Sequence, residues 1–274
     1  MSLIAHIKNE IMNTIFIING KKPWSFGYDS YKWKAIKKYL EGDLFNDGNL
    51  CEKYGFRIDE RIIEYPWLLS RLSKKEGFLL DAGSTLDYEL ILSHPTLLDK
   101  KIFISTLAPE RNCYWKRGIS YIFEDLRNCC YKDNYFDWVV CISTLEHIGM
   151  DNTMLYTTDP SKKENDNRSY LSAVKEYYRT LMPGGALFVT VPFGQYKNHG
   201  WFQVFDEKMV DTLINTFNPS SYLETHFRYL SNGWQKSSRI LSKDATCFDI
   251  HSQNKYDQDF AAFSRAIVCL EMVK

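Results

Sequence analysis

The stretch at residues 78–87, FLLDAGSTLD, has the form of a strand that turns sharply into a helix. Its apolar run ends at Asp81, and Gly83 follows two residues later. Open α/β sheets bind ligands beyond the carboxyl ends of their strands, where the strand order reverses, so this turn is a candidate cofactor loop. Glycine leaves room for a ligand, and the aspartate offers charge.

A dinucleotide cofactor is disfavoured at this turn. Dinucleotide-binding folds use Gly-x-Gly-x-x-Gly, in which the second glycine lets the backbone approach a pyrophosphate. Thr85 occupies that second position, and Leu86 follows it. A nucleoside cofactor without phosphates could still lie across Gly83, with its charged tail near Asp81 and the amides of the turn.

Two later strand ends carry polar residues that could contact the same ligand. The run YIFEDLRN places Glu124 and Asp125 at a strand end, where a carboxylate could accept a hydrogen bond from an adenine amino group. The buried run YFDWVVCIS then opens into a helix over residues 143–147. The order and spacing of these motifs favour one shared site.

Hydrophobic patterning predicts the elements that position these residues. From Phe78 onward, short β-type runs alternate with helix-length segments, which predicts βαβ units, a parallel sheet and helices on both faces. The late runs at 221–231 and 265–273 lack a convincing helix between them and predict an antiparallel pair at the sheet edge. Helical spacing of apolar residues before Phe78 predicts a helical cap over residues 1–76, packed on a unit of residues 77–274.

Composition restricts the class of partner. The 274 residues are 45% hydrophobic, enough for one large core, and 34 basic residues balance 34 acidic ones, so we expect no nucleic-acid surface. The seven cysteines are scattered without a Cys-x-x-Cys pair, which favours reduced thiols and no zinc. The apolar run at residues 15–18 is far shorter than the roughly 20 residues of a membrane span. We therefore expect a cytoplasmic protein with a small-molecule partner, no membrane contact and no metal.

This succession of motifs resembles the class I S-adenosylmethionine-dependent methyltransferases, in the group whose fourth strand reads like FDxVxxxxxLEH. The resemblance covers roughly residues 78–193 and extends to the closing run RAIVCLEMV. It implies a Rossmann-like methyltransferase fold: α/β, with a doubly wound, mostly parallel seven-stranded sheet. It also implies S-adenosyl-L-methionine as cofactor and methyl transfer as the activity.

The resemblance assigns cofactor contacts by position. Adenine would lie beside Leu126 with Asp125 as the acid, and the end of the fourth strand would contribute Ser143. The full set that it implies is Asp81, Ala82, Gly83, Ser84, Thr106, Asp125, Leu126, Ser143 and Glu146. The family usually has glycine where Thr85 stands, and an acid for the ribose hydroxyls where this chain has only Ser105 and Thr106. Ribose contacts are therefore expected to be weaker or to come from elsewhere.

A finer resemblance concerns the acceptor. The segments STLEHIGMDN, VTVPFG with the later HGW, and ERIIEYPW look like methyltransferases encoded with bacterial surface-polysaccharide genes. This implies a sugar or sugar-nucleotide acceptor, methylated at a hydroxyl. Two alternatives stay open: a nicotinamide-dependent oxidoreductase, since the same sheet hosts both activities, and a non-catalytic protein that keeps the fold.

Two histidines are candidate general bases. His199 lies in the loop after the fifth strand, beside Trp201, which could present a flat face to a sugar ring. His147 ends the LEH motif and could instead be a helix-start residue satisfied by the backbone. Either could remove the proton of an acceptor hydroxyl.

Residues of the N-terminal cap could also reach the ligand. Tyr28 could close over the cofactor, or Asp29 or Ser30 could simply cap the helix that starts there. Arg61 and Glu64 could reach the methionine end of the cofactor, or form a surface ion pair one helical turn apart. The polar insertion at residues 157–169 is expected to be a mobile loop.

Overall fold

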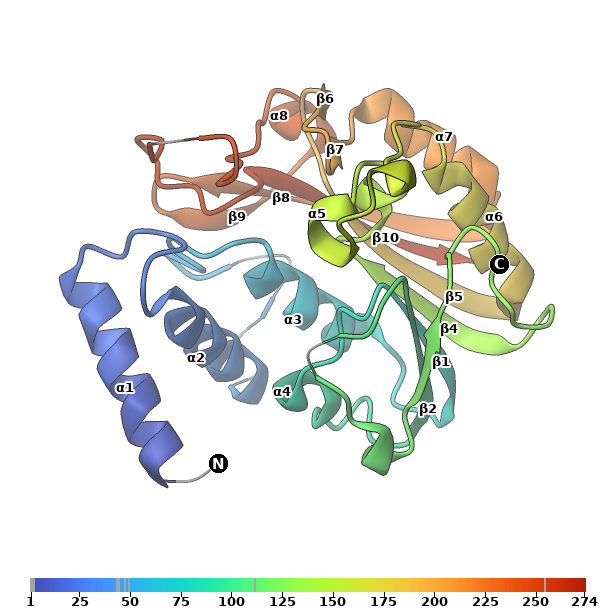
Figure 1. Ribbon diagram of the computed structural model, residues 1–274, viewed down its shortest axis with the longest axis horizontal. Coiled ribbons are helices and arrows are strands. Elements are labelled where there is room, and N and C mark those ends of the chain that lie inside the picture. The colour runs from blue at the N-terminus through green and yellow to red at the C-terminus, as the bar shows by residue number, and fades with distance from the viewer. Residues whose placement is uncertain (1–2, 43–44, 47, 49, 111, 254) are drawn as a thin grey trace.

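A computed structural model describes residues 3–274 apart from residues 43, 44, 47, 49, 111 and 254. Its centre is a sheet that has, within these residues, eight strands in the order β3-β2-β1-β4-β5-β10-β8-β9 (Figure 1). The strands are β1 (Gly77–Ala82), β2 (Lys100–Thr106), β3 (Ser120–Phe123), β4 (Phe136–Ile142), β5 (Leu181–Pro192), β8 (Ser221–Leu230), β9 (Gly233–Ser237) and β10 (Ala266–Val273). A separate small pair is formed by β6 (Lys197–Asn198) and β7 (Gln203–Val204).

The direction of the strands establishes the fold class. β1 pairs in parallel with β2 and β4, β2 with β3, and β4 with β5. β10 inserts antiparallel between β5 and β8. The predicted α/β fold with a doubly wound, mostly parallel sheet is therefore confirmed, and its strand order reverses between β1 and β4.

The carboxyl-terminal part of the sheet differs from the expectation in one respect. β8 and β10 do pair antiparallel, but β9 adds a strand beyond β8, so the described sheet has eight strands instead of seven and the pair is not at the edge. Gly233 lies at the start of β9 with φ of +117°, and a Cβ there would meet the Tyr54 carbonyl oxygen at 2.4 Å. The hairpin therefore packs directly on the N-terminal segment, which buries Trp234.

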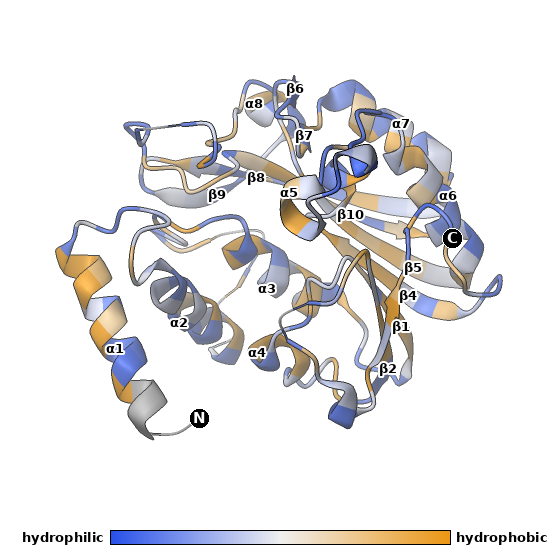
Figure 2. Ribbon diagram, viewed as in Figure 1, coloured by the Kyte–Doolittle hydropathy of each residue, from blue (hydrophilic) through white to orange (hydrophobic). Residues whose placement is uncertain are grey.

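Helices cover both faces of the sheet (Figure 1). The α-helices are α1 (Leu3–Ile18), α2 (Tyr28–Glu41), α3 (Arg61–Arg71), α4 (Glu89–Leu92), α5 (Thr153–Tyr156), α6 (Tyr170–Thr180), α7 (Glu207–Phe217) and α8 (Arg239–Ser242). Short 3₁₀ turns are η1 (Trp115–Arg117), η2 (Leu145–His147) and η3 (Pro160–Lys162). One apolar core joins the sheet to α2, α3 and α4, and a second joins its other face to α6 and α7. The strands between the two helical layers are accordingly rich in hydrophobic residues (Figure 2).

Helix α3 packs against the sheet, and it tolerates an internal proline. Pro66 has no N–H, so the carbonyl of Ile62 loses its helical donor. The hydroxyl of Tyr54 donates to that carbonyl at 2.9 Å and replaces the missing bond. This contact keeps the first turn of α3 regular, and that turn carries Arg61 and Glu64.

The start of α2 corrects one expectation. The helix begins at Tyr28 after Gly27, and neither Asp29 nor Ser30 caps it with a side chain. Gly27 has φ of +87°, and a Cβ there would lie 2.2 Å from the carbonyl oxygen of Met12 in α1. Close packing of α1 against this helix end therefore decides the local conformation. In the described part of the chain, no helix has the length and apolar character needed to cross a membrane.

Candidate functional site

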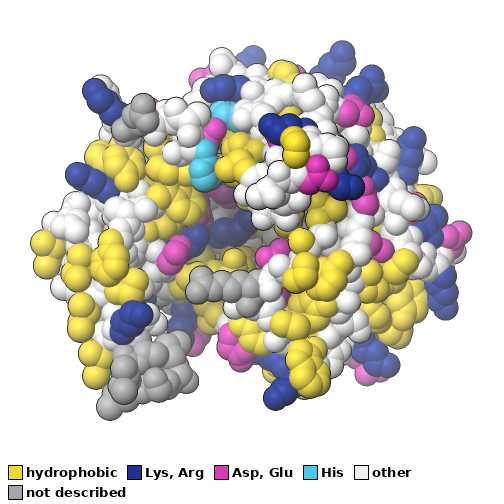
Figure 3. Space-filling view, in the orientation of Figure 1, with side chains coloured by type: hydrophobic (Ala, Val, Ile, Leu, Met, Phe, Trp, Pro, Cys, Tyr) yellow, Lys and Arg dark blue, Asp and Glu magenta, His cyan; other side chains and the backbone are white. Residues whose placement is uncertain are grey.

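A cavity of about 620 Å³ opens at the carboxyl ends of β1 to β4. Figure 3 shows this face of the molecule hollowed at its centre, with charged side chains inside the hollow. Strand ends contribute Gly83, Thr85, Thr106, Asp125, Leu126, Arg127, Ser143, Thr144 and His147 to its wall; Arg61 comes from α3, and Leu155, Tyr156, Thr157, Lys162 and Glu164 come from α5 and the polar insertion. The cavity therefore lies at the switch point where open α/β sheets bind their ligands.

Asp81 holds the turn after β1 from within. Its carboxylate accepts hydrogen bonds from the backbone N–H groups of Thr85 at 3.2 Å and Leu86 at 2.8 Å. The side chain is fully buried, and burial raises the pKa of Asp81 to about 7. Asp81 and the buried Ala82 thus lie behind the cavity wall instead of lining it.

Gly83 is required by the tertiary packing of the turn. Its φ is +116°, and a Cβ would lie 2.2 Å from Oγ1 of Thr144, at the end of β4. Ser84 follows with φ of +56°, an uncommon conformation for a residue with a side chain. The two strand ends therefore pack closely here, with Gly83 and Thr144 both at the cavity surface.

Glu110, which sequence reasoning missed, contacts two of the residues assigned to the cofactor site. Ser84 Oγ donates to its Oε1 at 2.8 Å, and Thr106 Oγ1 donates to the same oxygen at 3.3 Å. Glu110 is exposed in the loop after β2, and it is the first carboxylate after that strand in the sequence. An acidic side chain thus lies beside the end of β2, four residues beyond Thr106, and only that proximity in sequence could have indicated it.

The carboxylate of Asp125 already accepts hydrogen bonds from Arg127. Arg127 donates to both of its oxygens, at 2.9 and 2.6 Å, and also to the two oxygens of Glu164, at 2.8 and 2.7 Å. Partial burial would raise the pKa of Asp125, but the hydrogen bonds from Arg127 hold it below its usual value. Through these contacts the insertion at residues 157–169, expected to be a mobile loop, is tied to the strand end beside Leu126.

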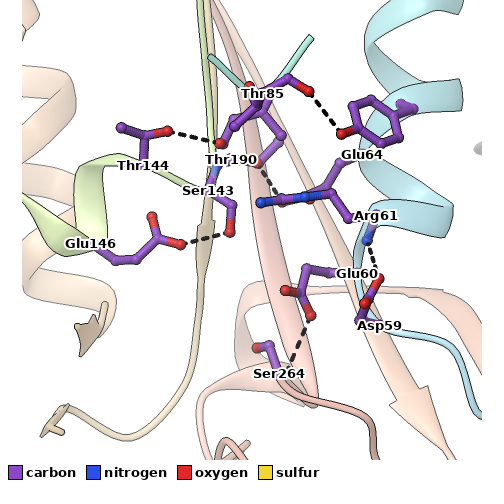
Figure 4. Close-up of polar contacts among 12 residues, drawn as sticks. Asp59, Glu60, Arg61, Glu64, Thr85, Ser143, Thr144, Glu146, Thr190 and Ser264 are labelled. Carbon is purple, nitrogen blue, oxygen red and sulfur yellow. Dashed lines mark hydrogen bonds and ion pairs between the residues drawn. The ribbon is translucent and has the colours of Figure 1, made fainter. Parts of the chain in front are cut away.

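A chain of hydrogen bonds joins α3 to the ends of β4 and β5 (Figure 4). Arg61 forms an ion pair with Glu64, and Thr190 Oγ1 donates to Glu64 Oε1 at 2.5 Å. The Ser143 N–H donates to Thr190 Oγ1 at 3.1 Å, and Ser143 Oγ donates to Glu146 Oε1 at 2.6 Å. Glu64 is completely buried, so the idea of a surface ion pair with Arg61 is wrong. The pair lies inside the protein because the sheet edge covers this face of α3, and Arg61 reaches the cavity.

Glu146 is the last residue in this series of hydrogen bonds, and one of its carboxyl oxygens is unpaired within the part of the chain that the structure describes. Its side chain is completely buried, and its Oε2 has no hydrogen-bond partner among the described residues. Burial raises its pKa to about 8, and burial together with the nearby Asp59 raises the pKa of Glu60 to about 8. Both groups therefore hold a proton near neutral pH in the folded protein.

These raised pKa values predict that stability falls as the pH rises. The unfolded chain releases glutamate protons near pH 4.3, whereas folded Glu146 keeps its proton to about pH 8. Between these limits the folded state binds more protons, so Glu146 should lower the free energy of unfolding by about 1.4 kcal/mol for each pH unit. Glu146→Gln mimics the protonated form and should remove the contribution of Glu146 to the slope in urea unfolding measured from pH 5 to 8, leaving that of Glu60. Glu76→Gln, at an exposed position, is the control; an equal slope in parent and Glu146→Gln would contradict the prediction.

His147 lines the large cavity and has a defined tautomer. Its Nδ1 lies 2.9 Å from the carbonyl oxygen of Trp201, which can only accept, so the hydrogen is on Nδ1. Nε2 is therefore the unprotonated nitrogen, 4.0 Å from Glu146 Oε1. Burial lowers the pKa of His147 to about 4. The backbone does satisfy this histidine, as one interpretation of LEH expected, but through one nitrogen only.

His199 lies at a neighbouring cavity of about 400 Å³, whose wall also includes Asp151, Lys163 and Trp201. Its side chain is 2% exposed and stacks on Phe202, with ring centroids 4.3 Å apart. It lies outside the set of described residues that line the large cavity, although Thr157 lines both. The structure thus brings His147, and not His199, to the cofactor-sized space.

Tyr28 lies in the N-terminal layer. Its hydroxyl donates to Asp59 Oδ2 at 3.0 Å and accepts from the Asp59 N–H at 2.9 Å, while Lys32 binds the same carboxylate at 2.8 Å. Asp59 Oδ1 accepts from the N–H of Arg61 at 3.2 Å. Tyr28 is buried and is not among the described residues that line the cavity. Its hydrogen bonds with Asp59 support the start of α3.

Of the residues expected to contact the cofactor, five lie at the large cavity: Gly83, Thr106, Asp125, Leu126 and Ser143. Asp81, Ala82, Ser84 and Glu146 stand behind its wall and hold these residues in place. The cofactor assignments themselves stay predictions.

No protein-family model matches the sequence, and no curated protein sequence matches it. Solved structures share the fold at low identity. The 1,6-didemethyltoxoflavin-N1-methyltransferase of Burkholderia thailandensis, solved with 1,6-didemethyltoxoflavin and S-adenosylhomocysteine, is 13% identical over 89% of each chain, with a TM-score of 0.45. A SAM-dependent methyltransferase of Methanosarcina mazei is 12% identical, covering 75% of this chain and 96% of its own, with a TM-score of 0.43. One from Thermotoga maritima is 15% identical, covering 89% and 100%, also with a TM-score of 0.43. These likenesses are distant, and the strand order alone establishes the fold.

Proposed function

We propose that this chain transfers a methyl group from S-adenosyl-L-methionine to a hydroxyl of a small-molecule acceptor. The observation that carries the proposal is the large cavity, which collects Gly83, Thr106, Asp125 and Ser143 from the carboxyl ends of four parallel strands. Its volume of about 620 Å³ is in the usual range for small-molecule and cofactor sites.

The side chains around the cavity fit the chemistry of this cofactor from end to end. Leu126 offers an apolar surface to adenine, and Asp125 can accept from its amino group. Glu110, held by Ser84 and Thr106, supplies a carboxylate for the ribose hydroxyls. At the other end Arg61, held by Glu64, supplies a guanidinium for the methionine carboxylate.

The residues of this chain would act mainly by positioning. The cofactor supplies a methyl group activated on a sulfonium. Holding the acceptor oxygen against that methyl carbon gives effective molarities of roughly 10⁵ to 10⁸ M. An imidazole that accepts the hydroxyl proton, from His199 or His147, contributes a further factor on the order of 10² to 10⁴.

The test of the proposal is cofactor binding followed by methyl transfer. Calorimetry should detect binding of S-adenosylhomocysteine, and a thermal-shift comparison should show stabilisation by S-adenosylhomocysteine and none by NAD. The turn has Thr85 where a dinucleotide fold requires glycine, which disfavours the oxidoreductase alternative. A folded protein that binds neither compound would favour the non-catalytic alternative and contradict the proposal.

For the acceptor we propose a sugar or sugar-nucleotide hydroxyl, used in the synthesis of a surface polysaccharide. The support is the resemblance in the STLEHIGMDN, HGW and ERIIEYPW segments, together with the aromatic and polar wall of the smaller cavity, where Trp201 and His199 lie. Each of the seven cysteines is free, which suits a reducing, cytoplasmic compartment. Methyl incorporation from labelled S-adenosylmethionine across a panel of nucleotide sugars would identify the acceptor.

Asp125 is expected to contribute about 1 to 3 kcal/mol to cofactor binding, the range for a hydrogen bond to a charged group. Asp125→Asn keeps the shape but places one amide donor where the adenine amine must donate. Calorimetry with S-adenosylhomocysteine should therefore show weaker binding by roughly ten- to a hundredfold. Because Arg127 loses its partner in the same variant, Glu164→Gln is the matched control: it perturbs Arg127 without touching Asp125. Equal affinity in the parent and Asp125→Asn would remove Asp125 from the adenine site.

A further inference from the structure

The smaller cavity lies directly beside the large one. Thr157 lines both, and the wall between them includes the contact from His147 Nδ1, in the large cavity, to the carbonyl oxygen of Trp201, in the small one. The small cavity is about 400 Å³ and has a mixed wall of aromatic and polar residues. An acceptor held here would therefore be next to the proposed cofactor site.

His199 is oriented at this cavity by a buried carboxylate. Its Nδ1 lies 3.5 Å from Asp249 Oδ2, and the two side chains are only 2% and 4% exposed. Asp249 is itself held, because the N–H of His251 donates to Oδ1 at 3.0 Å and Ser252 Oγ donates to Oδ2 at 2.9 Å. A carboxylate only accepts, so the hydrogen of a neutral His199 ring belongs on Nδ1, and Nε2 carries the free lone pair.

Two buried nitrogens at this cavity lack partners among the described residues: Nε2 of His199 and Nε1 of Trp201. Buried polar atoms without a partner are uncommon in native proteins, and each needs an explanation. The two atoms have opposite hydrogen-bonding character, since Nε2 of this tautomer accepts and an indole N–H only donates. A hydroxyl group complements both, because it donates its hydrogen to one and accepts with its oxygen from the other.

We infer that the small cavity binds the hydroxyl of the acceptor between His199 and Trp201, and that Asp249 is the positioning residue that makes His199 Nε2 the general base. This inference rests on the proposed methyl transfer. The acceptor oxygen forms a bond to the methyl carbon as the carbon–sulfur bond breaks, the electron pair of that bond stays on sulfur, and the hydroxyl proton passes to Nε2. Both nitrogens are buried, so the side chains that cover them must move to admit the hydroxyl.

The tautomer of His199 tests the pairing of His199 with Asp249, here called the dyad, without any substrate. In long-range ¹H–¹⁵N spectra of protein labelled in its histidine rings, the signal that disappears in His199→Asn identifies this residue. The parent should show Nδ1 protonated and Nε2 free near pH 7. In Asp249→Asn the N–H of His251 still requires an acceptor at Oδ1, so the amide oxygen takes that position. The amide NH₂ then replaces Oδ2 and faces Nδ1 of His199. The tautomer should then reverse, leaving Nε2 protonated.

Ser252→Ala is the matched control, because it removes a donor to Asp249 and keeps the carboxylate; its His199 should stay in the parent tautomer. A parent protein with Nε2 protonated, or an unchanged tautomer in a folded Asp249→Asn protein, would overturn the dyad. The tautomer of His199 in the parent protein tests the dyad even if Asp249→Asn does not fold. None of these outcomes depends on methyl transfer, so they are separate from a failure of the proposed function.

Turnover tests the catalytic part, with the nucleotide sugar that accepts label in the acceptor screen. Asp249→Asn should lower turnover by roughly 10²- to 10⁴-fold, while affinity for S-adenosylhomocysteine stays within about twofold of the parent. Trp201→Phe, which keeps an aromatic ring and removes the indole N–H, should raise KM for the sugar. Trp115→Phe, at a 63% exposed tryptophan, should match the parent. Parent-like turnover in an Asp249→Asn protein whose tautomer has reversed would overturn the role of His199 as the base.

Discussion

Replacing His199 with asparagine is expected to lower methyl-transfer turnover by roughly 10²- to 10⁴-fold, the contribution of a positioned general base. Affinity for S-adenosylhomocysteine should be nearly unchanged, because His199 lines the smaller cavity and not the cofactor-sized one. Burial lowers the pKa of His199 below its usual value, so the ring is neutral near pH 7 and able to accept a proton. Asparagine retains a donor toward Asp249 and keeps this buried carboxylate satisfied.

His147 is the rival base, and His147→Asn is the parallel variant. His147 does line the cofactor cavity, and its Nε2 is the free nitrogen, but burial lowers its pKa to about 4, which makes it a weak base. Single-turnover rates and calorimetry on both variants separate the two. A large rate loss in His147→Asn, with His199→Asn close to the parent, would move the base to η2. Parent-like rates in both would mean that positioning alone carries the reaction.

Replacing Gly83 with valine is expected to abolish cofactor binding, by at least about a hundredfold, and also to destabilise the fold. From the sequence alone, Gly83→Val is expected to exclude the ligand and to leave the fold intact. In the structure a Cβ at residue 83 would lie 2.2 Å from Thr144 Oγ1, and the φ of +116° is strained for any residue with a side chain. Backbone strain of this kind costs on the order of 1–3 kcal/mol. Urea unfolding measures the stability loss, and calorimetry measures the affinity.

Gly118→Val is the matched control for Gly83→Val. Gly118 has φ of +78°, and a Cβ there meets no atom of the described residues within 4 Å. It is not among the described residues that line the cavity. Gly118→Val should therefore lose stability through backbone strain alone, without a steric clash of the kind that Gly83→Val makes with Thr144. It should bind S-adenosylhomocysteine with the affinity of the parent. A folded Gly83→Val protein that binds S-adenosylhomocysteine like the parent would show that the cofactor does not lie across this turn.

The sequence by itself determined most of the architecture. Alternation of apolar strands and helix-length segments from Phe78 predicted the parallel sheet, and the lack of a convincing helix pattern between the last two runs predicted the antiparallel β8–β10 pair. The same reasoning predicted that the ends of β1, β3 and β4 lie close together, and Gly83, Asp125 and Ser143 do line one cavity. These predictions succeeded because hydrophobic period and strand direction are local properties of the chain.

Tertiary structure alone decided how the polar side chains are used. Asp81 stands two residues before Gly83, yet it turns inward to hold backbone N–H groups, while the exposed Glu110 reaches Ser84 from a loop. Glu64 is paired with Thr190, 126 positions away, which buries an ion pair that helical spacing places equally well at the surface. His199 meets Asp249 only because the chain returns after β9 to the loop that follows β5. A local pattern specifies which residues share a face of a helix or strand, but burial and charge pairing arise where distant segments pack together, so they become visible only in the folded chain.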